Sequence, residues 1–408
     1  METSERISAL SAAAERELRE GILPFWAERT VDREQGGFYG LITNDLKVDT
    51  EAPKGSVLNA RILWAFSAAF RAWPDPLYRE MADRAYAYLL EHFWDEEHSG
   101  LVWMVDHRGA SLNDRKQTYG QAFGIYAFSE YFRASGEREA LERAIRLFEN
   151  VEEHAFEPAH GGYIEALARD WSPLEDMRLS EIDLNVPYSQ NTHLHLLEAY
   201  ATLLQVWPES AVRERLRVLW EILAHRIRDE KTNQLILFQD RNWQSLSDAV
   251  SYGHDIEASW LLCETAEVLG DEAVLERTKT IALAMADNVL AEGFDHVHGG
   301  VSDAIDHHSA VLGKEWWPQA EAVVGFLNAF ELSGRAEFLD AVLESWRFIE
   351  EFVIDHDYGE WYYRVSPEGK PELDLPKVSP WKCPYHNARA ALEVIERTKR
   401  LRNRISAG

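Results

Sequence analysis

Two side chains that could act together, His254 and Glu257, lie three residues apart in the stretch Ser-Tyr-Gly-His-Asp-Ile-Glu-Ala-Ser-Trp-Leu-Leu at 251–262. The Tyr-Gly dipeptide ends a loop, and the apolar residues that follow predict a helix, so the two side chains share one face of its first turn. A helix N-terminus favours a carboxylate and lowers the pKa of a histidine. A neutral imidazole beside a carboxylate can act as a general base at neutral pH. The alternative is a pair that only caps the helix, and the rest of the chain must decide between the two.

Other polar or aromatic residues mark the starts of equivalent helices. Each follows a short hairpin in a repeated pattern, and the full set comprises Arg61, Tyr119, Asn191 with His195, His254 with Glu257, Trp317 and His386. Taken singly, Arg61 could form a structural ion pair and Trp317 could be ordinary core. Core residues that arise independently would not share one position of a repeat. The whole set therefore predicts a functional site at one end of a closed ring of helices.

Three histidines and a glutamate in this set raise the question of a zinc site. The three histidines come from separate helices, and no two of them have His-x-x-x-His spacing with a carboxylate between them. The many tryptophan residues instead favour a sugar site, because the apolar faces of pyranose rings stack on aromatic rings. The sequence therefore predicts a sugar-binding site without a metal.

These residues are positioned by a motif that occurs six times. A glycine turn, or a variant of it, followed by an aromatic or aliphatic strand stands at 32–40, 95–104, 157–165, 229–239, 294–303 and 355–364, and the copy at 229–239 is the weakest. Consecutive copies are roughly 60–70 residues apart, a spacing that indicates a repeat architecture. Each copy predicts a short β-hairpin.

Between the hairpins, the apolar periodicity predicts pairs of helices with a break between them. The pairs are 59–71 with 77–93, 119–134 with 141–154, 192–206 with 214–228, 256–269 with 272–291 and 317–332 with 336–352, and 386–401 pairs with 4–30. The sequence therefore predicts an all-α protein, an (α/α)6 barrel of about twelve helices with short β-hairpin inserts between helix pairs, which forms one catalytic domain over residues 1–408. An open solenoid is the alternative, but no terminal repeat has the polar surface of a cap.

Composition limits the partners and the compartment. The 408 residues carry a net charge of −28, which argues against nucleic acids and anionic membranes because both need a basic surface. No stretch reaches the roughly 18 apolar residues of a membrane span, and the N-terminus lacks the pattern of a signal peptide. Cys263 and Cys383 give no disulfide framework. We therefore expect a cytoplasmic protein that is a monomer, with a homodimer as the alternative.

Several phrases of the sequence together resemble one family. They are Val-Leu-Asn-Ala-Arg-Ile-Leu-Trp at 57–64, Asn-Thr-His-Leu-His at 191–195, the stretch at 251–262, Trp-Trp-Pro-Gln-Ala-Glu-Ala at 316–322 and Trp-Lys-Cys-Pro-Tyr-His-Asn at 381–387. This combination is similar to the cellobiose 2-epimerases of the N-acylglucosamine 2-epimerase superfamily, over about residues 18–400. The resemblance implies an (α/α)6 barrel that interconverts glucose and mannose at the reducing end of a β-1,4-linked disaccharide, without a cofactor. Cellobiose would give glucosyl-mannose, and lactose would give epilactose.

The resemblance also implies roles for individual residues. By motif position, His254 and His386 are expected as the acid/base pair, Arg61, Asn191, His195 and Glu257 as sugar-contacting and electrostatic residues, Trp317 and Trp381 as stacking platforms, and Tyr119 and Asp183 as further polar contacts. Two positions depart from the family pattern. Ser302 stands where some relatives have an aromatic residue, which weakens the expected grip on the outer sugar, and Ala388 replaces a glycine.

Epimerisation at C2 needs an open-chain aldose, removal of the C2 proton and return of a proton to the other face. Two histidines can serve opposite faces, and Arg61 would stabilise the anionic enediolate formed between the two transfers. We expect Glu257 to orient His254 or to assist ring opening. The proton that moves between O5 and O1 is expected to pass through His386 or His195.

Three other functions fit parts of the pattern. An aldose–ketose isomerase of mannose and glucose, or a mannose 2-epimerase of the same superfamily, would use the same enediolate. A glycoside hydrolase on the same barrel would need two opposed carboxylates, whereas this set is rich in histidine. A sugar-binding protein without activity would not need paired histidines.

Overall fold

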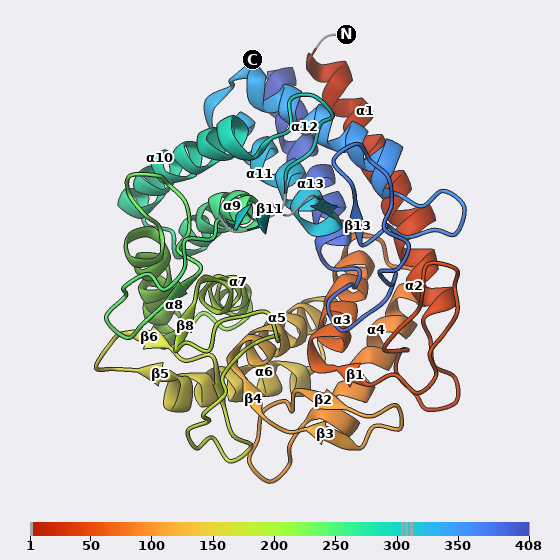
Figure 1. Cartoon of the computed structure of the whole chain (residues 1–408), viewed down its shortest axis with the longest axis vertical. Helices are drawn as coiled ribbons and strands as arrows, with labels where there is room; N and C mark the ends of the chain where they lie inside the picture. Colours follow the sequence, from red (N-terminus) through yellow and green to blue (C-terminus); the bar gives the residue numbers. More distant parts are fainter. Residues whose placement is uncertain (1–2, 303–304, 307–308, 311–312, 408) are drawn as a thin grey trace.

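The helices differ in how far they are buried, and this difference sets their place in the fold. In α5 (Thr118–Ser135), every residue from 118 to 131 is buried, as expected for a helix surrounded by protein. In α6 (Arg138–Asn150), only one stripe at helical spacing is buried, and the charged side faces solvent. The computed structural model, which describes residues 3–302, 305–306, 309–310 and 313–407, arranges these two kinds of helix as concentric rings (Figure 1).

Six helices form the inner ring, and helices of the second kind surround it. The inner helices are α3 (Ser56–Ala72), α5, α7 (Gln190–Val206), α9 (Tyr252–Leu269), α11 (Trp316–Ser333) and α13 (His386–Ala407). The outer helices are α1 (Thr3–Arg16) with α2 (Leu23–Arg29), α4 (Pro76–Tyr88), α6, α8 (Ser210–Ile222), α10 (Glu272–Asn288) and α12 (Ala336–Phe348). A π-helical turn, η1 (Glu17–Ile22), joins α1 to α2 into one continuous rod. The described residues thus form twelve rods, and the predicted (α/α)6 barrel is confirmed.

The ring closes through its last helix. α13 packs against α11 on one side and against α3 on the other, and it also contacts α1. The alternative of an open solenoid is therefore wrong. Each of the other outer helices ends, like α1, in a π-helical turn: η2 (Leu89–Phe93), η3 (Val151–Ala155), η4 (Leu223–Ile227), η5 (Val289–Gly293) and η6 (Ile349–Val353).

All six predicted hairpins form, although Asp303 at the end of the fifth copy lies outside the described residues. Their antiparallel contacts are Val31 with Phe38, Trp94 with Leu101, Phe156 with Tyr163, Arg228 with Leu235, Phe294 with Val301 and Ile354 with Trp361. The copy at 229–239 is the weakest match to the repeated motif because its turn contains no glycine. There Asn233 adopts a φ of 59°, a left-handed conformation that asparagine tolerates better than most residues.

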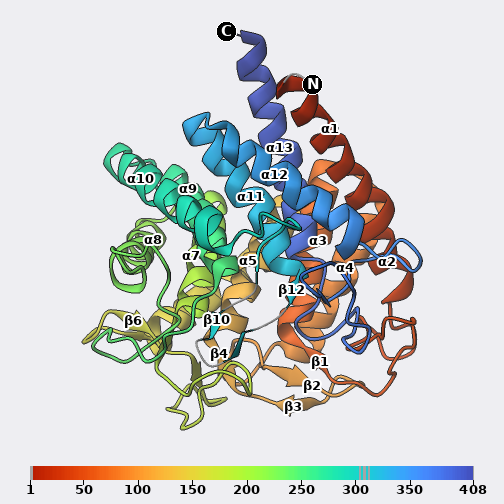
Figure 2. The same ribbon diagram turned by 45° about the horizontal axis from the view of Figure 1, so that its top comes forward.

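Short strands tie the start of each of four inner helices to a loop of the next repeat. The pairs are β1 (Lys54–Gly55) with β2 (Met104–Val105), β4 (Lys116–Gln117) with β7 (Ala166–Leu167), β8 (Tyr188–Ser189) with β9 (Phe238–Gln239), and β12 (Lys314–Glu315) with β13 (Arg364–Val365). The remaining strands are β3 (Ser111–Asn113) beside β2, β5 (Phe156–Glu157) with β6 (Gly162–Tyr163), and β10 (Ile305–Asp306) with β11 (Ser309–Ala310). They gather at one end of the barrel, whereas both termini lie at the other (Figure 2).

Buried ion pairs reinforce this end of the barrel. Four lysines bind the first aspartate of a hairpin, in the pairs Lys54–Asp32 (2.7 Å), Lys116–Asp95 (3.0 Å), Lys314–Asp295 (2.8 Å) and Lys377–Asp355 (2.7 Å). The starts of the inner helices are therefore held in place from several directions.

Among the described residues, no helix has both the length and the apolar character needed to cross a membrane.

One predicted boundary is wrong in a way that matters for the site. The sequence predicted that Tyr252 and Gly253 end a loop, but α9 begins at Tyr252. The hydroxyl of Ser251 accepts a hydrogen bond from the backbone N–H of His254 and so caps a helix that begins four residues before the predicted span 256–269. His254 and Glu257 consequently lie within the first two turns of α9.

Candidate active site

The repeat brings one residue from each of five inner helices into the barrel interior at the same level. The sixth residue of α3, α5, α7, α9 and α11 is, in turn, Arg61, Phe123, His195, Glu257 and Glu321. All five are buried. Equal spacing from equally anchored helix starts therefore explains why residues far apart in the chain converge.

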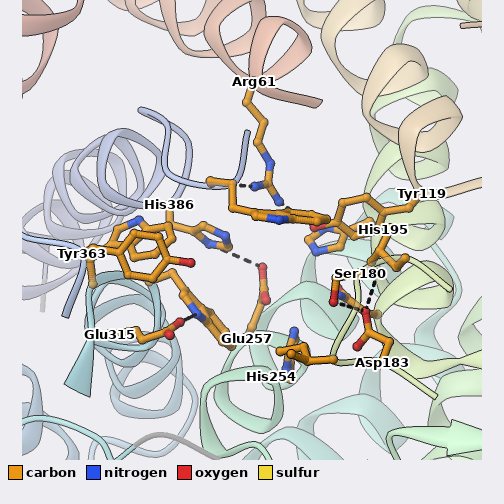
Figure 3. Close-up of a pocket in the computed structure, with 16 residues that line it drawn as sticks. Arg61, Tyr119, Ser180, Asp183, His195, His254, Glu257, Glu315, Tyr363 and His386 are labelled. Carbon is orange, nitrogen blue, oxygen red and sulfur yellow. Dashed lines mark hydrogen bonds and ion pairs between the residues drawn. The ribbon is translucent and has the colours of Figure 1, made fainter. Parts of the chain in front are cut away.

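A cavity of about 240 Å³ opens above this layer (Figure 3). All ten residues that the sequence singled out line it, namely Arg61, Tyr119, Asp183, Asn191, His195, His254, Glu257, Trp317, Trp381 and His386. Six further residues complete the wall: Leu179, Ser180, Ile182, Glu315, Trp316 and Tyr363. Ser302, one of the two departures from the family pattern, is not among these lining residues. Ala388 is buried in the first turn of α13, directly before Arg389.

His386 is held by a carboxylate from another helix. Its Nδ1 atom lies 2.6 Å from Oε1 of Glu321 and 4.0 Å from Oε1 of Glu257. Since an ionised carboxylate only accepts hydrogen bonds, Nδ1 carries the proton and Nε2 is left for the cavity. Burial, together with the positive charges of Arg61 and Arg389, lowers the pKa of His386 well below its usual value.

His254 lies on a different side of the cavity (Figure 3). Its Nδ1 atom is 2.7 Å from Oγ of Ser251, and its ring centroid is 4.5 Å from that of Trp317. Burial lowers the pKa of His254 to about 3. The expectation that Glu257 orients His254 is wrong, because Ser251 occupies that position and Glu257 turns towards His386 and Arg389.

His195 has the same kind of partner as His386. Its Nδ1 atom lies 3.1 Å from Oε2 of Glu198, one helical turn further along α7. The ring packs edge-on against Tyr119, with 5.1 Å between the centroids. Burial lowers its pKa, so a neutral imidazole is favoured here too.

Below the cavity, one guanidinium serves three carboxylates. Arg389 donates to Glu257 at 2.5 Å and to Glu321 at 2.7 Å, and it also contacts Glu198. Burial opposes ionisation of Glu198, but Arg389 and His195 outweigh it and hold its pKa at about 2. Burial and the nearby Glu321 raise the pKa of Glu257 well above its usual value. Burial raises the pKa of Glu321 as well, but Glu257 has the larger rise, so Glu257 is the carboxyl group of this cluster that most favours the protonated form.

Arg61 is fixed above the layer by polar and aromatic contacts. One of its terminal nitrogens donates to the hydroxyl of Tyr119 at 2.7 Å, and the other lies 3.4 Å from the carbonyl oxygen of Trp381. The guanidinium also lies over the rings of Phe123 (4.2 Å) and Tyr385 (4.7 Å). A permanent cation with so little freedom can stabilise negative charge that develops in the cavity.

The wall beside His254 is formed by Trp317. Its indole N–H donates to Glu315 at 2.8 Å, and Glu315 pairs with Arg364 at 3.0 Å. A glycine is required at 253, because a Cβ atom there would lie 2.6 Å from the Trp317 ring. The indole face is thereby held at the cavity edge.

On the opposite rim, two polar side chains are available to a ligand. Asp183 accepts from the backbone N–H (2.8 Å) and the hydroxyl (2.6 Å) of Ser180 through one oxygen. Two buried oxygen atoms, Oδ1 of Asn191 and Oε2 of Glu257, have no hydrogen-bond partner in the described part of the chain. Unsatisfied buried acceptors that line a cavity indicate a polar ligand.

Most of the partners of the site residues could not be recognised from the sequence pattern. Glu198, Glu321, Tyr385, Arg389 and Ser251 were not singled out, although Tyr385 donates to Glu198 at 2.5 Å and Trp260 to Glu321 at 3.0 Å. One signal could have found Glu321, since it is the sixth residue of its helix as Glu257 is of α9. The others depend on contacts between helices.

One group of side chains has the composition of a metal site. Ligand atoms of Glu257, Glu321 and His386 lie within 4.8 Å of one another. Arg389, however, already places a guanidinium nitrogen between the two carboxylates. A cation bound to all three residues would have to displace that guanidinium or sit against it, so the arrangement fits an internal ion pair better than a metal site.

Comparisons with known proteins agree with the fold. A sequence model of the N-acylglucosamine 2-epimerase (GlcNAc 2-epimerase) family matches residues 37–390. The cellobiose 2-epimerase of Bacteroides fragilis is 42% identical over 399 residues, which cover 95% of this chain and 98% of that protein. The solved structure of the cellobiose 2-epimerase from Bacillus thermoamylovorans superposes with a TM-score of 0.92 at 38% identity, over 96% of this chain and all (100%) of that one.

A more distant relative is the D-mannose isomerase of Marinomonas mediterranea, which is 23% identical over 92% of this chain and 95% of that protein. Together with the barrel and its cavity, these likenesses define an isomerase that acts as a sugar 2-epimerase. The chain belongs to the N-acylglucosamine 2-epimerase family. The resemblance read from the sequence motifs is thereby confirmed.

Proposed function

We propose that the enzyme epimerises C2 of the reducing-end glucose in β-1,4-linked disaccharides such as cellobiose and lactose, without a metal or a cofactor. One observation carries the proposal: His254 and His386 reach one cavity from separate helices, each with Nδ1 already bound. Each ring then offers Nε2 to the substrate, and the two approach from different sides (Figure 3). This is the arrangement that proton exchange at two faces of one carbon requires.

The first step is opening of the sugar ring. A base removes the proton on O1, the C1–O5 bond breaks, and O5 takes up a proton. Glu257 can supply the proton to O5, because its raised pKa keeps it protonated and its free Oε2 atom lines the cavity. His195 and His386 are the nearby bases for O1.

The second step is proton transfer at C2. One histidine removes the C2 proton, and the electron pair moves through the C1–C2 bond onto the aldehyde oxygen, which gives an enediolate. Arg61 and the hydroxyl of Tyr119 stabilise the negative charge. The other histidine, which holds the proton taken from O1 during ring opening, returns a proton to the opposite face of C2. When the ring closes, the first histidine gives its proton back to O1 and Glu257 takes back the proton on O5. Glucose thus becomes mannose, and the reverse reaction exchanges the roles.

The shape of the rim supports a disaccharide. Trp381 and Trp317 offer two separate indole faces, and Asp183 adds a carboxylate on a third side. One hexose would rarely need two such faces, so the second face is assigned to the outer sugar. The competing assignment, a mannose isomerase or mannose 2-epimerase, draws on the distant relative named D-mannose isomerase.

NMR of the products formed in D₂O from cellobiose, lactose and mannose tests the assignment. We expect glucosyl-mannose from cellobiose and epilactose from lactose, each with deuterium at C2, and slower turnover of mannose. Fructose from mannose, with deuterium at C1, would establish an isomerase instead. Turnover of mannose equal to that of cellobiose would move the assignment to a monosaccharide enzyme.

A further inference from the structure

Ser251 makes one contact that its structural role does not require. As the N-cap of α9, its Oγ atom accepts from the backbone N–H of His254 at 3.4 Å. Ser189 caps α7 in the same way, by accepting from the backbone N–H of Thr192 at 3.1 Å. The hydroxyl of Ser251 also reaches a histidine ring, with its Oγ atom 2.7 Å from Nδ1 of His254, whereas Ser189 contacts the ring of His193 through its backbone carbonyl. Capping explains the bond to the backbone and leaves the bond to the ring unexplained.

The partner of His254 differs in kind from those of the other two histidines in the cavity. Glu321 binds Nδ1 of His386 at 2.6 Å, and Glu198 binds Nδ1 of His195 at 3.1 Å. Within the described ranges, no ion pair joins His254 to a carboxylate. The charged or titratable groups that act on its ring are His195 of α7 and Glu321 of α11, and Glu257 follows on its own helix.

The difference has chemical consequences. A carboxylate stabilises an imidazolium by its charge, whereas a hydroxyl offers a hydrogen bond without charge. The hydroxyl of Ser251 can accept from Nδ1–H, which leaves a lone pair on Nε2 for the removal of a proton. The ring packs against Trp317 on one side, so rotation of the imidazole away from Ser251 is also restricted.

Resting on the function proposed above, we propose that Ser251 is a positioning residue of the reaction. It holds His254 through Nδ1 with Nε2 towards the substrate and leaves the ring uncharged between turnovers. Ser251 thus does for His254 what Glu321 does for His386, without adding a negative charge to a cavity floor that already holds three carboxylates.

The test uses three variants and one matched control. Ser251→Ala removes the hydroxyl, Ser251→Thr keeps it, and Ser251→Asp replaces it with a carboxylate. Ser189→Ala removes the equivalent cap of α7 without touching a histidine of the cavity and is the control for loss of capping. We expect Ser251→Ala to lower kcat by roughly tenfold to a hundredfold with KM changed less than about twofold. Ser251→Thr and Ser189→Ala should stay within about threefold of wild-type kcat.

Two further measurements separate positioning from folding. Ser251→Asp should raise the pKa of His254 and move the acidic limb of kcat/KM to higher pH by about one unit. In ¹⁵N-histidine NMR of the substrate-free enzyme, assigned with His254→Asn, wild-type His254 should show a protonated Nδ1 and an unprotonated Nε2. Ser251→Ala should lose this preference, and Ser189→Ala should keep it.

Wild-type kcat and an unchanged His254 spectrum in Ser251→Ala would overturn the proposal. Equal losses of kcat in Ser251→Ala and Ser189→Ala would also overturn it, since capping alone would then be the cause. If the wild-type enzyme left cellobiose, lactose and mannose unchanged, the proposed function would fail. The NMR measurement needs no substrate and would still decide whether Ser251 sets the state of His254.

Discussion

At the scale of single residues, the small number of positive charges near the carboxyl groups of the site determines which of them are ionised. Glu198, Glu257 and Glu321 all bind Arg389, and one guanidinium cannot balance three negative charges. Arg389 keeps Glu198 ionised, while burial keeps a proton on Glu257. The same cluster therefore supplies hydrogen-bond acceptors for two histidines, His195 and His386, and an acid for the sugar ring.

The assignment of two separate bases predicts opposite behaviour for two variants. His254→Asn and His386→Asn should each lower epimerisation by roughly a hundredfold to ten-thousandfold. Each variant keeps one base and should still exchange the C2 proton of one epimer with solvent. NMR in D₂O measures deuterium at C2 of the recovered substrate. We expect one variant to incorporate deuterium only into the glucose epimer, and the other variant only into the mannose epimer.

His225→Asn provides the control, since this histidine is partly exposed and pairs with Glu221 on the outer helix α8 and its extension. It should behave as the wild type. If both active-site variants incorporate deuterium from the same epimer, a single base serves both faces, and one of the two histidines has another role.

At the scale of the elements, a second register of the inner helices holds the hairpins. The fourth residue of α5, α7, α9 and α11 is Gln121, His193, Asp255 and Gln319, and each accepts a hydrogen bond from a backbone N–H of a hairpin strand. The two glutamines also donate to the carbonyl of the same strand residue. Asp255 accepts through Oδ1, and its buried Oδ2 atom has no partner in the part of the chain that the structure describes.

Asp255→Asn should therefore change how stability depends on pH. Burial raises the pKa of Asp255 to about 8, so the folded protein holds a proton that the unfolded chain releases near pH 4. The stability that this proton gives is complete below pH 4 and is lost as the pH rises towards 8, by about 1.4 kcal/mol per pH unit. The asparagine variant keeps an acceptor for Leu235 N–H and has nothing to ionise.

Urea unfolding at pH 5 and pH 7 measures the effect. Relative to the wild type, Asp255→Asn should gain roughly 2.5 to 3 kcal/mol in the free energy of unfolding between these pH values. Asp248→Asn, at an exposed aspartate of the same repeat, should show no such gain. A difference that stays constant with pH would mean that Asp255 is already ionised in the folded protein.

At the scale of the whole molecule, the ring itself could be predicted from the sequence, because six hairpins and six helix pairs at one spacing leave little choice of architecture. The ten predicted site residues could be found because they stand at helix starts or in family motifs, and all ten line one cavity. Their partners could not be found so easily. Arg389 meets Glu198, Glu257 and Glu321 only because α13 closes the ring, and no local pattern encodes a contact between helices.

Closure of the ring also gives the last prediction, which concerns Arg389→Met. The variant keeps much of the side-chain volume but leaves three carboxylates of α7, α9 and α11 without their shared cation. Removing one partner of a buried ionic cluster costs about 3–5 kcal/mol, so the free energy of unfolding should fall by that amount and epimerisation should be lost. Arg146→Met, which removes an exposed pair with Glu149, should cost no more than about 1 kcal/mol.

The dependence of this loss on pH identifies its cause. Arg389 holds the pKa of Glu198 at about 2, and without it burial would raise that pKa above the ordinary value. A carboxyl group with a raised pKa loses stability as the pH rises, so the gap between variant and wild type should be smaller at pH 5 than at pH 8. Arg389 also lies over the rings of Trp260 (4.8 Å) and Tyr385 (4.3 Å). A difference in the free energy of unfolding that does not change with pH would assign the loss to these packing contacts. Arg389 would then not stabilise the ring by balancing the charges of the carboxylates on the three helices.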